Sequence, residues 1–175
     1  LGYDFEKLPA AVRASHQQGP VTRLEGTARV DGAAPLGWLA ARIFGFPRKA
    51  DAAKVDVKKT TVSPGREIWE RAIGGSRFRS DIRFAGPGRV TERFGPFTFT
   101  LALSADETRH VMRIVGWRLG WLPLPGFLAP RSVAIEGATE DGSLTFDVPI
   151  AAPLLGRLTR YKGELRNTNI KERAT

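Results

Sequence analysis

The chain of 175 residues carries a formal charge of +9, and 42% of its residues are hydrophobic, enough for a single domain over residues 1–175 with a sizeable core. It has no cysteine, which excludes thiol nucleophiles, disulfides and cysteine-based metal sites and agrees with a reducing cytoplasm, where we expect the protein to act. No apolar run approaches the roughly 20 residues of a membrane-spanning helix, and basic and acidic residues are interleaved, so we expect neither a transmembrane segment nor a nucleic-acid partner.

The first predicted elements are a short helix and a strand. Apolar or small residues fall at helical spacing at Leu8, Ala11, Val12 and Ser15, and Gly19-Pro20 should end this helix. Over residues 22–30, apolar or small residues alternate with Arg, Glu and Thr, which is the period-two pattern of a strand with one side in water.

The next segment, residues 35–46, is apolar on nearly every side, with Arg42 as its only charge. A helix that is apolar all round is either buried or placed against lipid, and about three turns are too short to cross a bilayer. We expect this helix to cover the concave face of the sheet. The alternative is a mobile lid, or a membrane-touching patch that admits a lipid.

Strand patterns then follow almost without interruption, with Gly, Pro or Asp-Gly at the turns between them. They cover residues 54–62, 66–73, 77–84, 89–94, 97–104, 109–121, 131–138, 143–150 and 157–166. We therefore expect a mainly β fold: an antiparallel barrel or half-barrel of about nine strands, with an N-terminal helix and one apolar helix. No glycine-rich phosphate loop follows a strand and opens a helix, so no nucleotide cofactor is expected.

A carboxylate on an apolar strand face is the most informative feature of this sheet. Glu92 lies between Val90 and Phe94, so alternation points it toward the interior, and by the same rule Arg113 shares a face with Trp117. One interpretation is a structural ion pair or a strand end that reaches solvent. The other makes Glu92 and Arg113 the polar fixtures of a ligand pocket, a base or anchor beside an anion-binding guanidinium.

Aromatic side chains are the candidates for the wall of such a pocket. They are Trp38, Trp69, Phe97, Trp117, Trp121 and Tyr161, and the alternative is that they belong to an ordinary core. The apolar stretch 117–130 contains three prolines, and a central strand does not tolerate proline, so we expect this stretch to run as a loop. We interpret it as a flap at the mouth of the cavity or, alternatively, as a second hydrophobic plug.

Motifs of catalysis and metal binding are weak in this sequence. His16 and His110 are far apart and have no H-x-x-H or H-E-x-x-H spacing, so a histidine-based metal site is not expected. No serine lies in a nucleophile-elbow motif, and neither histidine has a serine or acid partner by spacing.

Several short strings in this order resemble a known family. They are Trp69–Gly75, Arg77–Ser80 and Glu92–Phe97, followed by Leu122–Pro125, Phe146–Val148 and Tyr161–Gly163, and the likeness extends from about Tyr3 to Leu165. The sequence is similar to an uncharacterised bacterial family, domain of unknown function 4166. Its members stand alone or are attached to saccharopine-dehydrogenase-like proteins, so the resemblance implies a dehydrogenase-like partner. It implies no catalytic residues, and Trp121 stands where a smaller aliphatic residue is expected.

Three functional hypotheses follow from these patterns. The leading one is a binding module that holds a hydrophobic or amphipathic, lipid-like molecule in the barrel, with Glu92 and Arg113 at its polar end. The second is a small barrel enzyme, a cyclase, isomerase or hydrolase on a lipid- or polyketide-like substrate, with Glu92 as base. The third is an accessory interaction domain of a dehydrogenase-like protein, docked through residues 117–130.

Overall fold

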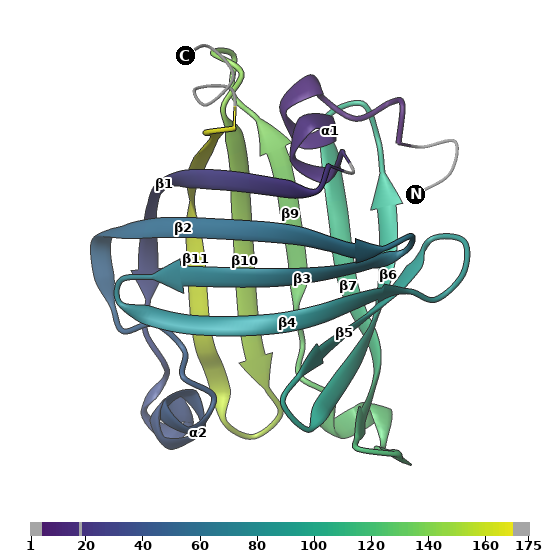
Figure 1. Ribbon diagram of the computed structural model, residues 1–175. Helices are drawn as coiled ribbons and strands as arrows, with labels where there is room; N and C mark the ends of the chain where they lie inside the picture. The colour runs from purple at the N-terminus through teal and green to yellow at the C-terminus, as the bar shows by residue number, and fades with distance from the viewer. Residues whose placement is uncertain (1–4, 18, 170–175) are drawn as a thin grey trace.

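The computed structural model describes residues 5–17 and 19–169, and its strands form one antiparallel sheet (Figure 1). The strands are β1 (Val21–Asp31), β2 (Ala50–Ser63), β3 (Arg66–Ile73), β4 (Ser76–Phe84), β5 (Arg89–Phe94), β6 (Phe97–Ala105), β7 (Arg109–Leu119), β8 (Leu122–Pro123), β9 (Val133–Ala138), β10 (Leu144–Ala152) and β11 (Gly156–Asn167). The helical segments are α1 (Ala10–His16), η2 (Pro35–Gly37), α2 (Trp38–Ile43) and η3 (Gly126–Leu128).

The sheet closes on itself because β6 pairs with β7 as well as with β5. Around the barrel the order is β6-β5-β4-β3-β2-β1-β11-β10-β9-β7, and the short β8 adds to β7 outside this ring. Closure removes the free edges that an open sheet would expose to other chains. The expected mainly β, antiparallel barrel is confirmed, with ten strands in the barrel where about nine were expected.

Two glycines allow the barrel to bend sharply where β1 meets β11. A Cβ atom on Gly26 would lie 1.9 Å from the carbonyl oxygen of Glu164, and one on Gly163 would lie 2.0 Å from that of Thr27. No other residue fits at either position without moving the backbone, because real carbon–oxygen contacts are far longer. The bend lets β1–β4 cross in front of β9, β10 and β11 at a steep angle (Figure 1).

The two ends of the barrel differ. At the upper end in Figure 1, α1 lies across the barrel, and its Val12 and Ser15 are buried. At the lower end α2 lies beside the β10–β11 hairpin, with Gly37 and Ala41 buried but Leu36, Trp38 and Ile43 at 73%, 59% and 74% exposure. Residues 35–46 therefore have an exposed outer face, whereas Phe44 and Phe46 line the interior of the barrel.

A hydrophobic core joins the N-terminal segment to five neighbouring strands. It is built from buried residues of β1, β2, β3, β10 and β11 together with Leu8 and Val12, and it includes Val30, Val55 and Phe146. This core fixes α1 on the upper end of the barrel. No helix in the described part of the chain is long and apolar enough to cross a membrane.

Candidate functional site

The barrel surrounds a cavity of about 400 Å³. This volume falls in the range of roughly 300–1,000 Å³ that is typical of small-molecule sites in proteins. Most of the wall is apolar, with residues such as Leu101, Met112 and Ile114. The polar side chains that reach the cavity include His16, Lys59, Glu67, Arg71, Glu92, His110, Glu136 and Tyr161.

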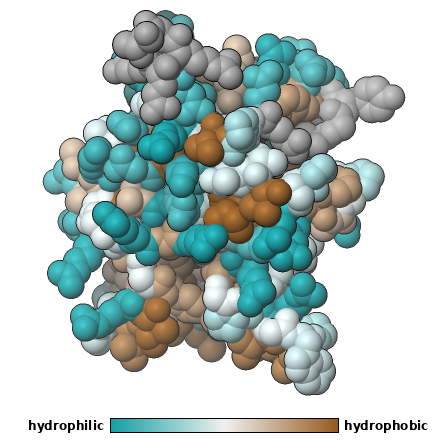
Figure 2. Space-filling model, viewed as in Figure 1, coloured by the Kyte–Doolittle hydropathy of each residue, from teal (hydrophilic) through white to brown (hydrophobic). Residues whose placement is uncertain are grey.

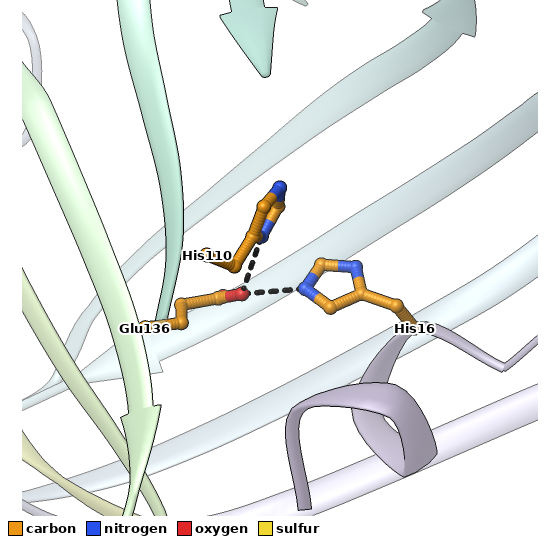
Figure 3. Close-up of side chains that lie close together, drawn as sticks. All are labelled: His16, His110 and Glu136. Carbon is orange, nitrogen blue, oxygen red and sulfur yellow. Dashed lines mark hydrogen bonds and ion pairs between the residues drawn. The ribbon is translucent and has the colours of Figure 1, made fainter. Parts of the chain in front are cut away.

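Two histidines and a glutamate meet at the upper end of this cavity (Figure 3). The Nε2 atom of His16 lies 2.5 Å from Oε2 of Glu136, and Nδ1 of His110 lies 3.1 Å from the same oxygen. The two imidazole rings stand edge to face with centroids 5.0 Å apart. The three side chains come from α1, β7 and β9, so the closure of the barrel and the position of α1 create the cluster.

Strand register explains part of this meeting. His110 and Glu136 are direct cross-strand partners in the antiparallel pair of β7 and β9, which places their side chains on the same face. His16 ends α1, whose contacts with β9 and β10 bring the ring down onto the carboxylate.

Charge decides the protonation states in the cluster. Burial acts to raise the pKa of Glu136, but the contacts with His16 and His110 and the charge of Lys59 outweigh it and hold that pKa well below its usual value. The ionised carboxylate only accepts hydrogen bonds, so His16 Nε2 and His110 Nδ1 both carry protons and donate to it. The pKa of His16 is lowered, mainly by burial and also by the charge of Lys59, so its ring stays neutral.

Lys59 is a buried cation beside this cluster. Its side chain is only 6% exposed, its Nζ donates to the carbonyl oxygen of Ser15 at 2.9 Å, and it lies 4.0 Å from the centre of the Trp69 ring. Burial lowers the pKa of Lys59 to about 8, against the attraction of Glu136 and Glu67. Trp69 is itself fixed, because its Nε1 donates to Glu67 at 2.7 Å.

A second polar group lies further along β3. Arg71 donates to Ser80 Oγ and to Glu92 Oε1, both at 3.0 Å, and Ser80 Oγ donates to the same Glu92 oxygen at 2.7 Å. The guanidinium of Arg71 lies 4.6 Å from the centre of the Trp69 ring, on which Lys59 also packs. The Trp69 ring therefore contacts a cation of each polar group, and we call the two groups together the polar stripe of the inner wall.

His16, His110 and Glu136 are also able to hold a metal ion. One ligand atom from each, two imidazole nitrogens and a carboxylate oxygen, lies within 4.8 Å of the others. This is the donor set of many zinc sites, in which a water or substrate takes the fourth position. The positive charge of Lys59 close by opposes a divalent cation, so the same atoms also form a stable hydrogen-bonded cluster without one.

Part of the site anticipated from the sequence lines the cavity. Glu92 does so, as do Trp69 and Tyr161, both of which are buried. Burial raises the pKa of Tyr161 to about 12, so its phenol stays protonated. Phe97 and Trp117 are not among the lining residues; their rings stack near the lower end with an interplanar angle of 12°, and Phe97 contacts the lining residue Phe44 at a centroid distance of 5.4 Å.

The other anticipated residues point outward. Arg113 is exposed and does not line the cavity, so its expected place at the polar end of a ligand is wrong. The physical reason is a β-bulge at Val115, which pairs with no residue of β6 and shifts the alternation, so that Arg113 and Trp117 lie on opposite faces. Trp38 and Trp121 are 59% and 89% exposed and belong to the outer surface.

Sequence reasoning missed His16, His110, Glu136, Lys59 and Arg71. The spacing of the two histidines gave no acid partner for either, but helix placement and barrel closure bring both to Glu136 although they are 94 positions apart in sequence. One sequence signal could have indicated this site. His110 lies two positions before the inward-facing Met112 on β7, and Glu136 lies two positions after the inward-facing Ala134 on β9, so each is a polar residue on an apolar strand face.

Comparisons with known proteins define the family but no activity. A family model described as a domain of unknown function (DUF4166) matches residues 8–165. The match covers most of the chain, so the chain belongs to this family. No curated protein matches the chain in sequence.

Proposed function

We propose that this chain, a member of the family described as domain of unknown function DUF4166, binds one amphipathic small molecule in its cavity. The carrying observation is the arrangement of the cavity: an apolar wall with polar side chains gathered under α1 at the upper end. An apolar wall with a few convergent polar groups is the usual plan of a small-molecule site.

The path into the chamber supports this orientation. Among the lining residues, Phe44 and Phe84 are also 42% and 62% exposed, and we place the mouth of the cavity beside Phe44, next to α2. A ligand that enters there passes apolar walls before it meets Lys59 and His16. Its apolar body then remains near the mouth and its polar end lies deepest.

The polar stripe favours a head group that accepts hydrogen bonds. The Lys59 ammonium has three N–H donors, and among the described residues one of them is used, on the carbonyl oxygen of Ser15. Arg71 likewise has five donors and uses two, on Ser80 and Glu92. A hydroxyl, carbonyl or carboxylate oxygen of a ligand can accept hydrogen bonds from these donors. The carboxylates of Glu136 and Glu92 can accept a hydrogen bond from a hydroxyl group of the same ligand.

A fluorescent fatty acid tests the proposal. Titration with 11-(dansylamino)undecanoic acid should give saturable, one-to-one emission enhancement in wild-type protein. Ala134→Trp, which fills the chamber from β9, should weaken binding at least roughly tenfold because the chamber loses the volume of a large ring. Val115→Trp adds the same ring on the outer face of β7, where Val115 is 51% exposed, and should leave binding unchanged. Equal binding by the two variants would contradict a site inside the barrel.

The second candidate is a small metal-dependent enzyme, favoured by the meeting of His16, His110 and Glu136. Glu92, the base in the sequence-derived version of this hypothesis, is engaged by Arg71 and Ser80, so the cluster under α1 is the better centre. Equilibrium dialysis against Zn²⁺ followed by elemental analysis separates the candidates. The enzyme requires one ion per chain in wild-type protein and none in His110→Gln, whereas the binding module requires neither.

A further inference from the structure

Exposed hydrophobic side chains gather at one end of the barrel. Of the fourteen large hydrophobic residues that are exposed in the described chain, eleven lie in three segments, residues 35–49, 117–131 and 151–157, which we call the lower rim. The most exposed of them are Leu154 at 90%, Trp121 at 89%, Phe127 at 77% and Ile43 at 74%. Single exposed hydrophobics are normal on protein surfaces, but such a concentration marks an interaction site.

Contacts between the three segments show that they surround the same opening. Gly37 lies against the carbonyl oxygens of Leu155 and Arg157, which joins the first segment to the third. Arg131 pairs with Ala151, which joins the third to the second. Trp117 of the second segment stacks on Phe97, and Phe97 packs at a tilt against Phe44 of the first segment, which joins the second segment to the first. In Figure 1 all three segments lie at the lower end, and Figure 2 shows hydrophobic surface along the same lower edge, at the position of α2 and beside it.

The charge of the lower rim has one sign. Its three segments contain no Asp or Glu, and they carry six exposed basic residues: Arg42, Arg48, Lys49, Arg118, Arg131 and Arg157. Among the ion pairs of the described residues, none involves these six. The rest of the barrel wall differs, because its basic residues are interleaved with acidic ones, as in the pairs of Arg66 with Asp81 and Lys58 with Glu70.

We propose that the lower rim docks on the surface of an anionic lipid bilayer. Exposed Trp, Leu and Phe side chains with Arg or Lys around them are the combination that lies in the membrane interface, where aromatic rings insert and cations meet lipid phosphates. A second copy of the chain is a poorer occupant, because two rims with six cations each and no anion would repel one another. The inference does not depend on a ligand in the cavity, although docking would place the mouth beside Phe44 against the lipid.

Vesicle flotation tests this inference. Wild-type protein should float with vesicles of phosphatidylcholine and phosphatidylglycerol at a 70:30 ratio, should bind pure phosphatidylcholine at least roughly tenfold less, and should lose binding as NaCl rises from 50 to 500 mM. Trp121→Ser with Phe127→Ser should lower the partition coefficient by roughly a hundredfold, because two inserting rings are removed. Arg118→Gln with Arg131→Gln should lower it roughly tenfold.

Matched controls fix the location. Val62→Ser with Val115→Ser removes exposed apolar groups from the barrel wall, and Arg77→Gln with Arg79→Gln removes two charges from the outer face of β4. Both control proteins should bind vesicles like wild type. Absence of vesicle binding, equal binding to neutral vesicles, or equal loss in control and rim variants would overturn the inference. So would dimerisation in gel filtration that the Trp121→Ser, Phe127→Ser protein loses, because a second copy would then be the occupant.

Discussion

Replacing Lys59 by methionine should make the protein more stable at neutral pH. Methionine keeps the length and apolar stem of the side chain and removes only the ammonium. Lys59 is 6% exposed, and burial lowers its pKa from 10.5 to about 8. A base whose pKa is lower in the folded state binds its proton more weakly there than in the unfolded chain, so the charged form of Lys59 opposes folding.

The magnitude follows from this change in pKa. Each unit is worth about 1.4 kcal/mol, so charging Lys59 in the folded protein costs about 3 kcal/mol at pH 7, with the attraction of Glu136 and Glu67 already included. The variant also loses the hydrogen bond to Ser15, worth about 1 kcal/mol. A net gain of about 2 kcal/mol remains, which corresponds to a rise in Tm of about 4–8 °C for a chain of this size.

Urea denaturation at pH 7 and pH 10 distinguishes this reasoning from a packing effect. The penalty on Lys59 is complete below pH 8 and disappears as pH rises toward 10.5, so the electrostatic gain of Lys59→Met should fall below about 1 kcal/mol at pH 10. Groups that do not interact with Lys59 contribute equally to both proteins, so their effects cancel in the difference between the two proteins. A variant that is less stable than wild type at pH 7, or whose difference is the same at both pH values, would refute the argument. A confirmed gain would mean that the chain keeps Lys59 at a cost in stability. Residues that are needed for function often carry such a cost.

Three further outcomes are expected. Glu136→Gln should lower the free energy of unfolding by roughly 3–5 kcal/mol in chemical denaturation, because it removes the carboxylate that accepts from both histidines and is the stronger of the two that attract Lys59; a loss below 1 kcal/mol would contradict the role of this carboxylate. The pKa values of Glu136 and His16 are both lower in the folded protein than in the unfolded chain, so protonation of either group favours the unfolded chain. Tm should therefore fall as pH drops below 6.5, where His16 is protonated in the unfolded chain, and fall further below pH 4.5, where Glu136 is. Gly163→Ala should destabilise by roughly 3 kcal/mol or more, because its Cβ would lie 2.0 Å from the Thr27 oxygen, whereas Gly126→Ala, with open space around it, should cost little.

Much of the barrel could be predicted from residue alternation, because a strand with one apolar and one polar face has a period of two. The pattern held well for β4, where Phe78, Ile82 and Phe84 all line the cavity. It failed in β7, where both faces carry apolar residues and the bulge at Val115 reverses the alternation. Arg113 was therefore assigned to the interior, although nothing in its immediate neighbours marks the bulge.

The candidate site was less accessible to sequence reasoning. Glu92 was found because it is the single charge between two apolar inward residues of β5, and its inward position is correct. Its partner is Arg71, which belongs to β3, two strands away in the sheet. The sequence alone does not give the register between these strands, so it does not show that Arg71 and Glu92 meet. The cluster of His16, His110 and Glu136 joins a helix to two strands, and only tertiary packing decides where that helix lies.

Native mass spectrometry of protein purified under gentle conditions, followed by organic extraction and analysis of the released compound, tests the central claim most directly. If the cavity holds a ligand, the mass of the wild-type protein should exceed the 19.2 kDa of the chain by the mass of one small amphipathic molecule. Ala134→Trp purified in the same way should show only the mass of its own chain. A wild-type protein that always carries only its own mass, and that takes up no amphiphile when supplied with an extract of cellular lipids, would contradict it.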